Sequence, residues 1–291
     1  MASVSRRRAL TALGAAVAAT AVAPGPAHAA EPAPHARPAR PARPLAQAHA
    51  HNDYEHRRPL LDALDHRFTS VEADIYLVDG DLLVAHDPQD LDPARTLRTL
   101  YLDPLAQRVR AHGGAVYPRW KGEFQLLVDI KADGEAAYQE LDRELRAYPD
   151  LFTSYRRGRV RRSAVTVVVS GDRAARGPME AQTERRAFYD GRLSDLGSAA
   201  PASLIPLISD NWSNNFGWQG VGAIPAAQRA KLRRIVSDAH GCGQRVRFWS
   251  TPDTPGRARE AVWNELLAAG VDHLNTDDLA GLRTFLDARR R

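Results

Sequence analysis

The segment that decides the fold is Ala46 to Asp87, which reads Ala46-Gln-Ala-His49-Ala-His51-Asn-Asp-Tyr54 and, after a helix-like stretch, Ser70-Val-Glu72-Ala-Asp74-Ile-Tyr-Leu-Val-Asp79-Gly80-Asp-Leu-Leu-Val-Ala-His86-Asp87. Because side chains on a strand alternate between its two faces, His49 and His51 share one face, and Glu72 and Asp74 share another. The dipeptide Asp79-Gly80 between two apolar runs predicts a β-hairpin that returns His86 toward the carboxylates. The segment therefore predicts a pocket lined by two acids and two histidines.

Short apolar strands alternate with helical segments along the chain from Leu45. The predicted strands are residues 45–51, 71–78, 82–86, 124–130, 164–169, 204–208, 245–249 and 273–276, with a weaker one near 191–196. The predicted helices are residues 59–66, 96–112, 134–148, 180–188, 225–240, 258–269 and 279–288. Apolar strands separated by helices indicate a parallel sheet covered on its faces, and about eight such units predict an α/β fold closed into a (β/α)8 TIM barrel. A doubly wound open sheet is the alternative.

The first 44 residues do not resemble part of a folded domain. Residues 1–29 combine a basic start containing Arg6, Arg7 and Arg8, an apolar run, and small residues at positions 27 and 29, a pattern typical of a cleavable export signal. The paired arginines favour the twin-arginine route and a secreted protein. A membrane anchor is the alternative, but the apolar run is shorter than the roughly 20 residues that a span needs, so we expect no stable membrane span. Residues 30–44 form a Pro/Ala/Arg-rich tether, and residues 45–291 are one domain.

The basic character of the chain belongs to this leader. Six of the 40 Lys and Arg residues, but only one of the 35 Asp and Glu residues, lie before residue 45, so the remainder carries 34 of each. A neutral domain gives no basis for nucleic-acid binding. Cys242 is the single cysteine, which excludes an internal disulfide, and we expect a monomer stabilised by its core.

Polar residues gather where the predicted strands end, which is where barrels of this kind place their sites. They are His51, Asp129, Lys131, Ser170, Asp210, Trp249 and Asp277. Glu72, Asp74 and Asp129 offer hard oxygen ligands, which suit one divalent cation, Mg²⁺ or Ca²⁺. Salt bridges to Arg or Lys are the alternative for these acids, but two inward-facing carboxylates are costly without a cation, so the sequence favours a metal site.

His51 and His86 are the predicted catalytic pair. A histidine on each side of a substrate can act as base or nucleophile on one side and protonate the leaving oxygen on the other. His49 is the alternative to His51, which we prefer because it is the last residue before the loop. Asn52 and Asp277 are further possible site residues. Asp210 and Asn211 are predicted substrate-binding residues near the start of the polar and aromatic segment 209–220, which either reads substrate or caps the barrel rim.

The order of these motifs resembles the glycerophosphodiester phosphodiesterase and phosphatidylinositol phospholipase C superfamily. The resemblance rests on His51, Glu72-x-Asp74, the hairpin at Asp79-Gly80, His86-Asp87 and Asp129-x-Lys131. The His-x-His-Asn-Asp-Tyr opening and the Ser-Val-Glu-Ala-Asp strand are most similar to the "altered inheritance of mitochondria protein 6" group, and the similarity extends over residues 45–291. The chain lacks the His-Arg-Gly opening and the Pro-Glu-Asn of the diesterases, which leaves a glycerol-type substrate open.

The resemblance implies a TIM-barrel hydrolase that cleaves a small-molecule or lipid phosphodiester. It implies a cation held by Glu72, Asp74 and Asp129, and proton transfer by His51 and His86. Substrate contacts would come from Lys131, which would hold a phosphate oxygen, and from Trp249, which would line the pocket. A different metal-assisted hydrolase and a non-catalytic binding barrel at the cell envelope are the alternatives.

Overall fold

The structure, a computed structural model, describes residues 43–290, so the predicted export signal and nearly all of the predicted tether lie outside the described residues. The strands are β1 Leu45–Ala50, β2 Phe68–Val78, β3 Asp81–Val84, β4 Phe124–Ile130, β5 Ser154–Arg156, β6 Arg159–Arg161, β7 Val165–Gly171, β8 Glu184–Arg185, β9 Ala187–Gly191, β10 Leu207–Asn211, β11 Arg245–Trp249 and β12 His273–Thr276. The α-helices are α1 Leu61–Asp65, α2 Asp103–Ala111, α3 Gly134–Arg146, α4 Arg176–Ala181, α5 Trp212–Asn215, α6 Ala226–Gly241, α7 Arg257–Ala269 and α8 Leu279–Ala288.

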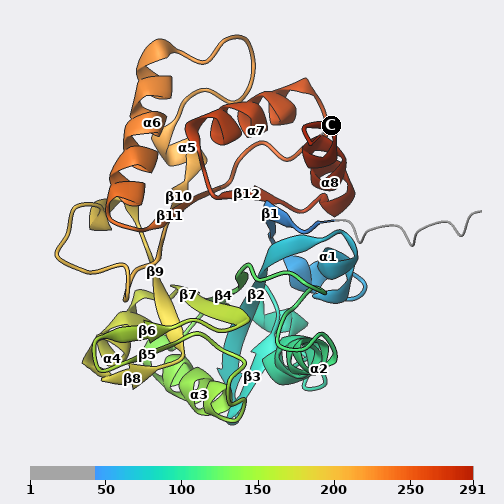
Figure 1. Ribbon diagram of the computed structural model, residues 1–291, viewed down its shortest axis with the longest axis vertical. Helices are drawn as coiled ribbons and strands as arrows, with labels where there is room; N and C mark the ends of the chain where they lie inside the picture. Colours follow the sequence, from blue (N-terminus) through green and yellow to red (C-terminus); the bar gives the residue numbers. More distant parts are fainter. Residues whose placement is uncertain (1–42, 291) are drawn as a thin grey trace, which may run out of the picture. The chain divides into compact units, whose positions relative to one another are not determined.

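Eight parallel strands form a closed ring in the order β1-β2-β4-β7-β9-β10-β11-β12, and β12 pairs back onto β1 (Figure 1). This arrangement confirms the predicted single-domain TIM barrel over the open-sheet alternative. Strand β3 is an addition to the ring, because it pairs antiparallel with β2 through the predicted hairpin. Asp79 and Gly80 have φ values of 50° and 89°, the left-handed pair that a tight hairpin turn requires.

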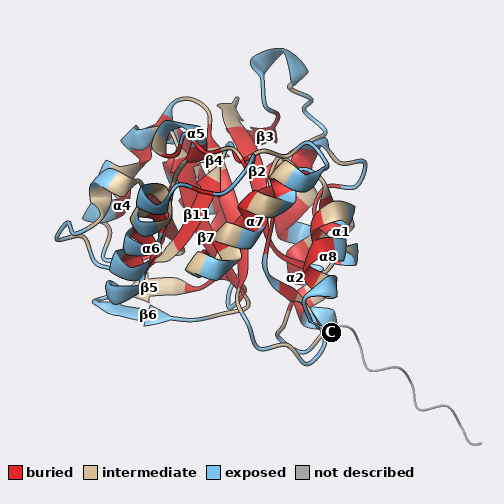
Figure 2. Cartoon of the chain, turned by 90° about the horizontal axis from the view of Figure 1, so that it is seen from above, coloured by how far each residue is buried: buried red, intermediate tan, exposed pale blue. Residues whose placement is uncertain are grey.

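The barrel strands are buried on both faces, as Figure 2 shows. One face of each strand packs under the helices in the main apolar core, to which Val128, Val169 and Ile208 belong. The preceding residue on each of these strands, Leu127, Val168 or Leu207, belongs to a second, three-residue apolar cluster. Because side chains alternate along a strand, this small cluster lies inside the ring. This cluster has three residues, so it fills only a small part of the interior.

The structure corrects two predicted elements in the middle of the chain. The predicted helix 180–188 is wrong, since α4 ends at Ala181 and β9 occupies residues 187–191. The predicted weak strand at 191–196 is displaced, because residues 193–195 form a short 3-10 turn. Ala187, Phe188 and Tyr189 are consecutive and all buried, which a strand covered on both faces permits and an amphipathic helix does not.

A buried carboxyl group supports the loop between β1 and α1. Asp53 is fully buried, and one of its oxygens accepts hydrogen bonds from the Leu60 amide at 2.5 Å and the Tyr101 hydroxyl at 3.0 Å. Leu60 has a φ of 64°, so this contact holds a residue in a strained left-handed conformation. Burial raises the pKa of Asp53 to about 7, because the ionised form loses its hydration.

This pKa predicts a pH-dependent stability. The protonated carboxyl is favoured in the folded state, so its contribution is complete below the unfolded pKa of about 4 and is lost as the pH rises through about 7. Asp53→Asn keeps an acceptor for Leu60 but does not titrate. Between about pH 5 and pH 8, the free energy of unfolding should fall by roughly 3 kcal/mol more in the unsubstituted protein than in Asp53→Asn. Thermal melts across this range check the difference, and equal pH slopes would contradict it.

Candidate active site

Three carboxylates converge at the carboxyl ends of two neighbouring strands. Glu72 and Asp74 lie on β2, and Asp74 pairs in register with Asp129 on β4. Ligand oxygens from the three residues lie within 4.8 Å of one another. Gly171 on the next strand makes room for this arrangement, because a Cβ there would lie 2.7 Å from Asp129 Oδ1 and 2.2 Å from the Ile130 carbonyl oxygen. The sequence-predicted acidic trio is therefore a single cluster.

Lys131 lies against two of these acids. Its ammonium nitrogen is 2.8 Å from Asp74 Oδ2 and 3.1 Å from Asp129 Oδ1. Burial nevertheless raises the pKa of Asp129 to about 6, and the charges of Glu72 and Asp74 act in the same direction, against the lowering effect of Lys131. The second oxygen of Asp74, Oδ1, is buried and has no partner among the described residues. An unpartnered buried oxygen within a carboxylate cluster fits a hard divalent cation.

Glu72 is held from inside the barrel by two residues. His49 is fully buried, with Nδ1 2.7 Å from Ser70 Oγ and Nε2 3.2 Å from Glu72 Oε2. The buried guanidinium of Arg247 on β11 donates to the same Glu72 oxygen, and its Nε lies 2.9 Å from Asn275 Oδ1. Burial lowers the pKa of His49 to about 3, so His49 is neutral. Arg247 holds the pKa of Glu72 below its usual range despite burial. Glu72 is therefore ionised, and only its other oxygen remains for a ligand.

The two predicted catalytic histidines are open to solvent, unlike His49. The side chain of His51 is 27% exposed and that of His86 is 54% exposed. His51 Nδ1 lies 2.7 Å from Asp277 Oδ1, and His86 Nδ1 lies 2.9 Å from Asp74 Oδ2. Burial lowers the pKa of His51, but the hydrogen bond to Asp277 and the charge of Glu72 outweigh it, and the pKa is raised overall. In each histidine the carboxylate fixes Nδ1, which leaves Nε2 for a substrate.

Tyr54 connects His86 to Asp74, and sequence reasoning missed it although it belongs to the His-x-His-Asn-Asp-Tyr motif. Its hydroxyl lies 2.6 Å from Asp74 Oδ2, 2.7 Å from Asn52 Oδ1 and 3.1 Å from His86 Nδ1. Asn52, with a φ of 47°, turns the chain after β1 so that its side chain reaches Tyr54. The predicted site residue Asn52 therefore contacts Tyr54, which in turn contacts His86.

The structure divides the predicted substrate residues into two groups. Trp249 is partly exposed at the end of β11, in register with Asn211 at the end of β10. Asp210 precedes Asn211 and faces the other side of the strand. Its two carboxylate oxygens accept hydrogen bonds from the amides of Leu193 and Asn211, at 3.1 and 2.8 Å. Asp210 therefore joins the end of β10 to the segment after β9 and lies outside the barrel interior. Substrate contact by Trp249 stays a prediction.

The segment 211–216, at the end of β10 and through α5, is mainly structural. Asn211 caps α5 by accepting the Asn214 amide at 3.1 Å. Trp212 and Phe216 are fully or almost fully buried and stack with ring centroids 4.1 Å apart. The described aromatic side chains of this segment therefore pack into the core, as the rim-capping alternative expects.

A second buried polar cluster lies across the barrel from β1. Asp190 on β9 is fully buried, and its Oδ2 accepts Ser170 Oγ at 2.7 Å, Ser209 Oγ at 2.6 Å and Arg192 Nη1 at 2.7 Å. Sequence reasoning missed Asp190 and Arg192 because it placed this strand several residues too late. The correct register would have shown an acid and an arginine two residues apart, on the same inward face.

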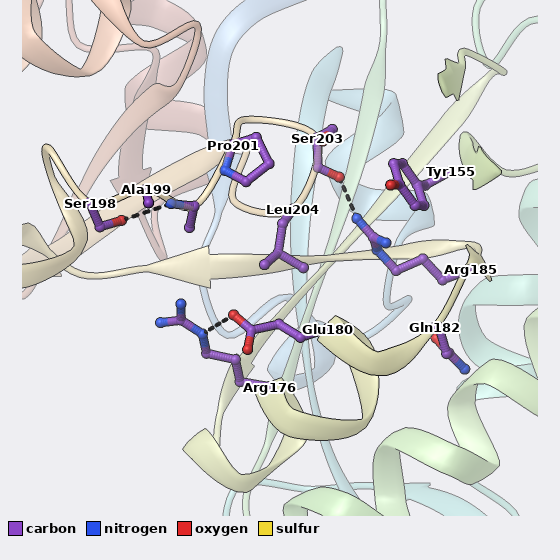
Figure 3. A pocket seen from close by; sticks show the side chains of 11 residues that line it. Tyr155, Arg176, Glu180, Gln182, Arg185, Ser198, Ala199, Pro201, Ser203 and Leu204 are labelled. Carbon is purple, nitrogen blue, oxygen red and sulfur yellow. Dashed lines mark hydrogen bonds and ion pairs between the residues drawn. The ribbon is translucent and has the colours of Figure 1, made fainter. Parts of the chain in front are cut away.

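A separate pocket of about 460 Å³ lies outside the ring (Figure 3). Its walls come from α4, from Tyr155 and Arg185, and from residues 198–204. Its lining extends from Arg185, just before β9, to Ser198 in the loop after β9. Arg176 in its wall is paired with Glu180 at 2.7 Å and with Asp195 at 2.8 Å. The pocket contains none of the residues of the acidic cluster.

The chain is thus a TIM barrel that carries carboxylates, a lysine and two histidines at the carboxyl ends of its strands. Residues 40–190 match the AIM6-like phosphodiesterase domain, and residues 245–280 match the glycerophosphoryl diester phosphodiesterase family. The chain belongs to the AIM6-like phosphodiesterase family, which confirms the resemblance seen in its motifs.

Two curated relatives align over most of the chain. "Altered inheritance of mitochondria protein 6" of Eremothecium gossypii is 31% identical over 83% of this chain and 69% of its own length. The homolog from Arthroderma benhamiae is 29% identical over 81% of this chain and 82% of its own length. A solved glycerophosphoryl diester phosphodiesterase from Parabacteroides distasonis has the same fold, with a TM-score of 0.51 at 13% identity, over 84% of this chain and 87% of that one. Within residues 43–290, no helix is long and apolar enough to cross a bilayer.

Proposed function

We propose that this chain is a metal-dependent phosphodiesterase that uses His51 and His86 for proton transfer. The observation that carries the proposal is the convergence of the acidic trio, Lys131 and two solvent-accessible histidines at one end of the barrel. Glu72, Asp74 and Asp129 would hold one divalent cation, Mg²⁺ or Ca²⁺. The bound cation would polarise the phosphoryl oxygens and offset the negative charge that develops during displacement.

The chain's own residues supply the other requirements. The Lys131 ammonium lies between Asp74 and Asp129, where it is positioned to bind an anionic phosphoryl oxygen. Asp277 fixes the tautomer of His51 so that Nε2 carries the lone pair and can accept a proton from the attacking hydroxyl group. His86, oriented by Asp74 and Tyr54, would protonate the leaving alcohol oxygen. The assignment of base and acid between the two histidines is part of this proposal.

Hydrolysis of a phosphodiester panel by the mature protein, with and without chelator, tests the function. We expect turnover of at least one diester and its loss in excess chelator. The non-catalytic alternative is favoured by one observation: Lys131 and Arg247 already neutralise part of the acidic cluster. Folded protein that turns over no diester in the presence of Mg²⁺ or Ca²⁺ would support that alternative and refute the proposal.

The proposal extends to secretion by the twin-arginine route, because residues 1–29 have the pattern of such a signal. Replacing Arg6 and Arg7 with lysine should retain the protein in the cytoplasm when the full chain is expressed in a bacterial host with this pathway. Unchanged export of the lysine variant would argue against this route.

Asp277 provides a test of His51 through the pH dependence of the rate. Its hydrogen bond is one of the two main causes that raise the pKa of His51, so Asp277→Asn should lower that pKa. In a plot of kcat/KM against pH, the limb that reports the ionisation of His51 should therefore move to lower pH. If His51 is the base, the acidic limb moves; if it is the acid, the alkaline limb moves. A profile that does not shift while the rate falls would show that His51 does not titrate in the reaction.

A further inference from the structure

Arg192 lies at the barrel mouth opposite His51, and the proposed mechanism gives it no role. Strand β9 lies four strands from β1 in either direction around the ring. Arg192, which directly follows Gly191 at the end of β9, therefore lies across the mouth from His51. It is close to the acidic cluster, because its Nη2 lies 3.2 Å from Ser170 Oγ, and Ser170 is the register partner of Asp129.

The guanidinium of Arg192 is held in place by buried groups. Nη1 is fixed by Asp190 Oδ2 at 2.7 Å, and Asp190 is in turn held by Ser170 and Ser209. An exposed ion pair contributes little, but a pair anchored on a fully buried carboxylate keeps one geometry. The side chain nevertheless remains 25% exposed. Arg192 is thus fixed at its inner edge and open toward the barrel mouth.

Arg192 retains hydrogen-bonding capacity on its open edge. A guanidinium has five N–H donors, and no described residue accepts from Nε, while Nη2 contacts only Ser170. Asp129 and Asp210 also lie near Arg192, but both are engaged elsewhere. Asp129 contacts Lys131, and Asp210 accepts two backbone amides. Nε and Nη2 together form the planar fork that binds a carboxylate or phosphate in a bidentate manner.

We infer that Arg192 binds a second anionic group on the substrate, so that the preferred substrate is a phosphodiester whose alcohol carries a carboxylate or a phosphate. The inference rests on the proposed phosphodiesterase function. If Lys131 and a cation on the acidic cluster hold the phosphoryl group, the alcohol would extend across the mouth between Arg192 and Trp249. A cationic alcohol such as choline is disfavoured, because its charge would approach a fixed guanidinium.

The test uses p-nitrophenyl phosphodiesters whose second alcohol is hydroxybutyrate, butanol or aminobutanol. These alcohols are similar in length and differ in terminal group and charge. The unsubstituted protein should hydrolyse the hydroxybutyrate ester with the highest kcat/KM. Arg192→Met should lower the ratio of the hydroxybutyrate rate to the butanol rate by about 10- to 100-fold, the range for a hydrogen bond to a charged group. Arg234→Met on the exposed face of α6 is the matched control and should leave the ratio unchanged.

Removing Arg192 alone leaves Asp190 buried without a counter-charge, which can prevent folding. The double variant Asp190→Leu/Arg192→Met removes both charges and should show the same loss of preference in a folded protein. An unsubstituted protein that prefers the butanol or aminobutanol ester would overturn the inference. A folded double variant that slows all three esters equally would also overturn it, because Arg192 would then only support the barrel.

Binding separates this inference from the proposed function. Non-hydrolysable phosphonate analogues of the hydroxybutyrate and butanol esters can be titrated into the protein by calorimetry. If no ester is hydrolysed, but the carboxylate phosphonate binds more tightly and Arg192→Met abolishes that difference, the anion-binding role of Arg192 stands and the catalytic proposal fails. Equal affinity for the two phosphonates overturns the inference, whatever the catalytic result.

Discussion

Replacing His51 or His86 with alanine should lower kcat for a phosphodiester by about 10²- to 10⁴-fold, the range for loss of a positioned general acid or base. The structure supports this pair over one containing His49. His49 is fully buried beneath Glu72, whereas His51 and His86 are open and each has Nδ1 fixed by a carboxylate. Substituting His49 should instead destabilise the fold, because it removes one buried hydrogen-bonding partner from Ser70 and one from Glu72.

A matched control comes from a histidine outside the site. His240 at the end of α6 is 43% exposed and lies 2.9 Å from Asp272, so it forms a histidine–aspartate pair like that of His51. His240→Ala should retain full activity. The double variant His51→Ala/His86→Ala should be little worse than the more damaged single variant, because residues that act as a unit are not additive. If both single variants retain near-normal kcat, the two-histidine mechanism is wrong.

The sequence predicted the acidic cluster because the relevant strand is long and its alternation is unambiguous. Glu72 and Asp74 lie two residues apart on a strand buried over most of its length, and the hairpin turn is fixed by Asp79-Gly80. Residues that share a face of one strand can be assigned without knowing the neighbouring strands. Adding Asp129 required only that β4 lie beside β2, which the order of parallel units provides.

The sequence did not predict the two arginines that line the interior. Arg247 lies in a predicted strand, but an arginine there suggests an exposed position until its carboxylate partner on a distant strand is known. Arg192 was not recognised, because the strand that corresponds to β9 was predicted several residues too late. Asp210 was predicted as a substrate residue because it lies at the end of a strand, as the site residues do. Its side chain, however, lies on the face of the strand that points away from the barrel interior. A shift of one residue decides whether a strand-end side chain reaches the barrel mouth.

Asp74→Asn should abolish most turnover, with a loss of at least about 10²-fold, because this residue contacts His86 and Lys131 and belongs to the acidic trio. Its Oδ2 is 2.6 Å from the Tyr54 hydroxyl, 2.9 Å from His86 Nδ1 and 2.8 Å from Lys131 Nζ, and Oδ1 is the buried oxygen without a described partner. Asparagine has the same shape but lacks the charge. It also places an amide donor against one of these groups or into the cation position.

The cation gives this prediction a readout that does not depend on activity. A ligand that binds only the folded state stabilises it by about 2.7 kcal/mol at a concentration of 100 Kd, which corresponds to a rise in Tm of roughly 5–10 °C for a domain of this size. Mg²⁺ or Ca²⁺ should produce such a rise in the unsubstituted protein and little or none in Asp74→Asn. Asp142→Asn is the control, since Asp142 is a buried acid on α3 that is paired with Arg146.

The two readouts together distinguish a metal site from a network of salt bridges. Lys131 and Arg247 could by themselves compensate the acids, and in that case neither cation would change the Tm and chelator would leave turnover intact. If a cation binds, Asp74→Asn should lose both the thermal shift and the activity, whereas Asp142→Asn keeps both. Equal thermal shifts in the two variants would place the cation elsewhere. If Asp74→Asn loses activity but the cation still raises its Tm as in the unsubstituted protein, Asp74 positions His86 and Lys131 and does not bind the metal.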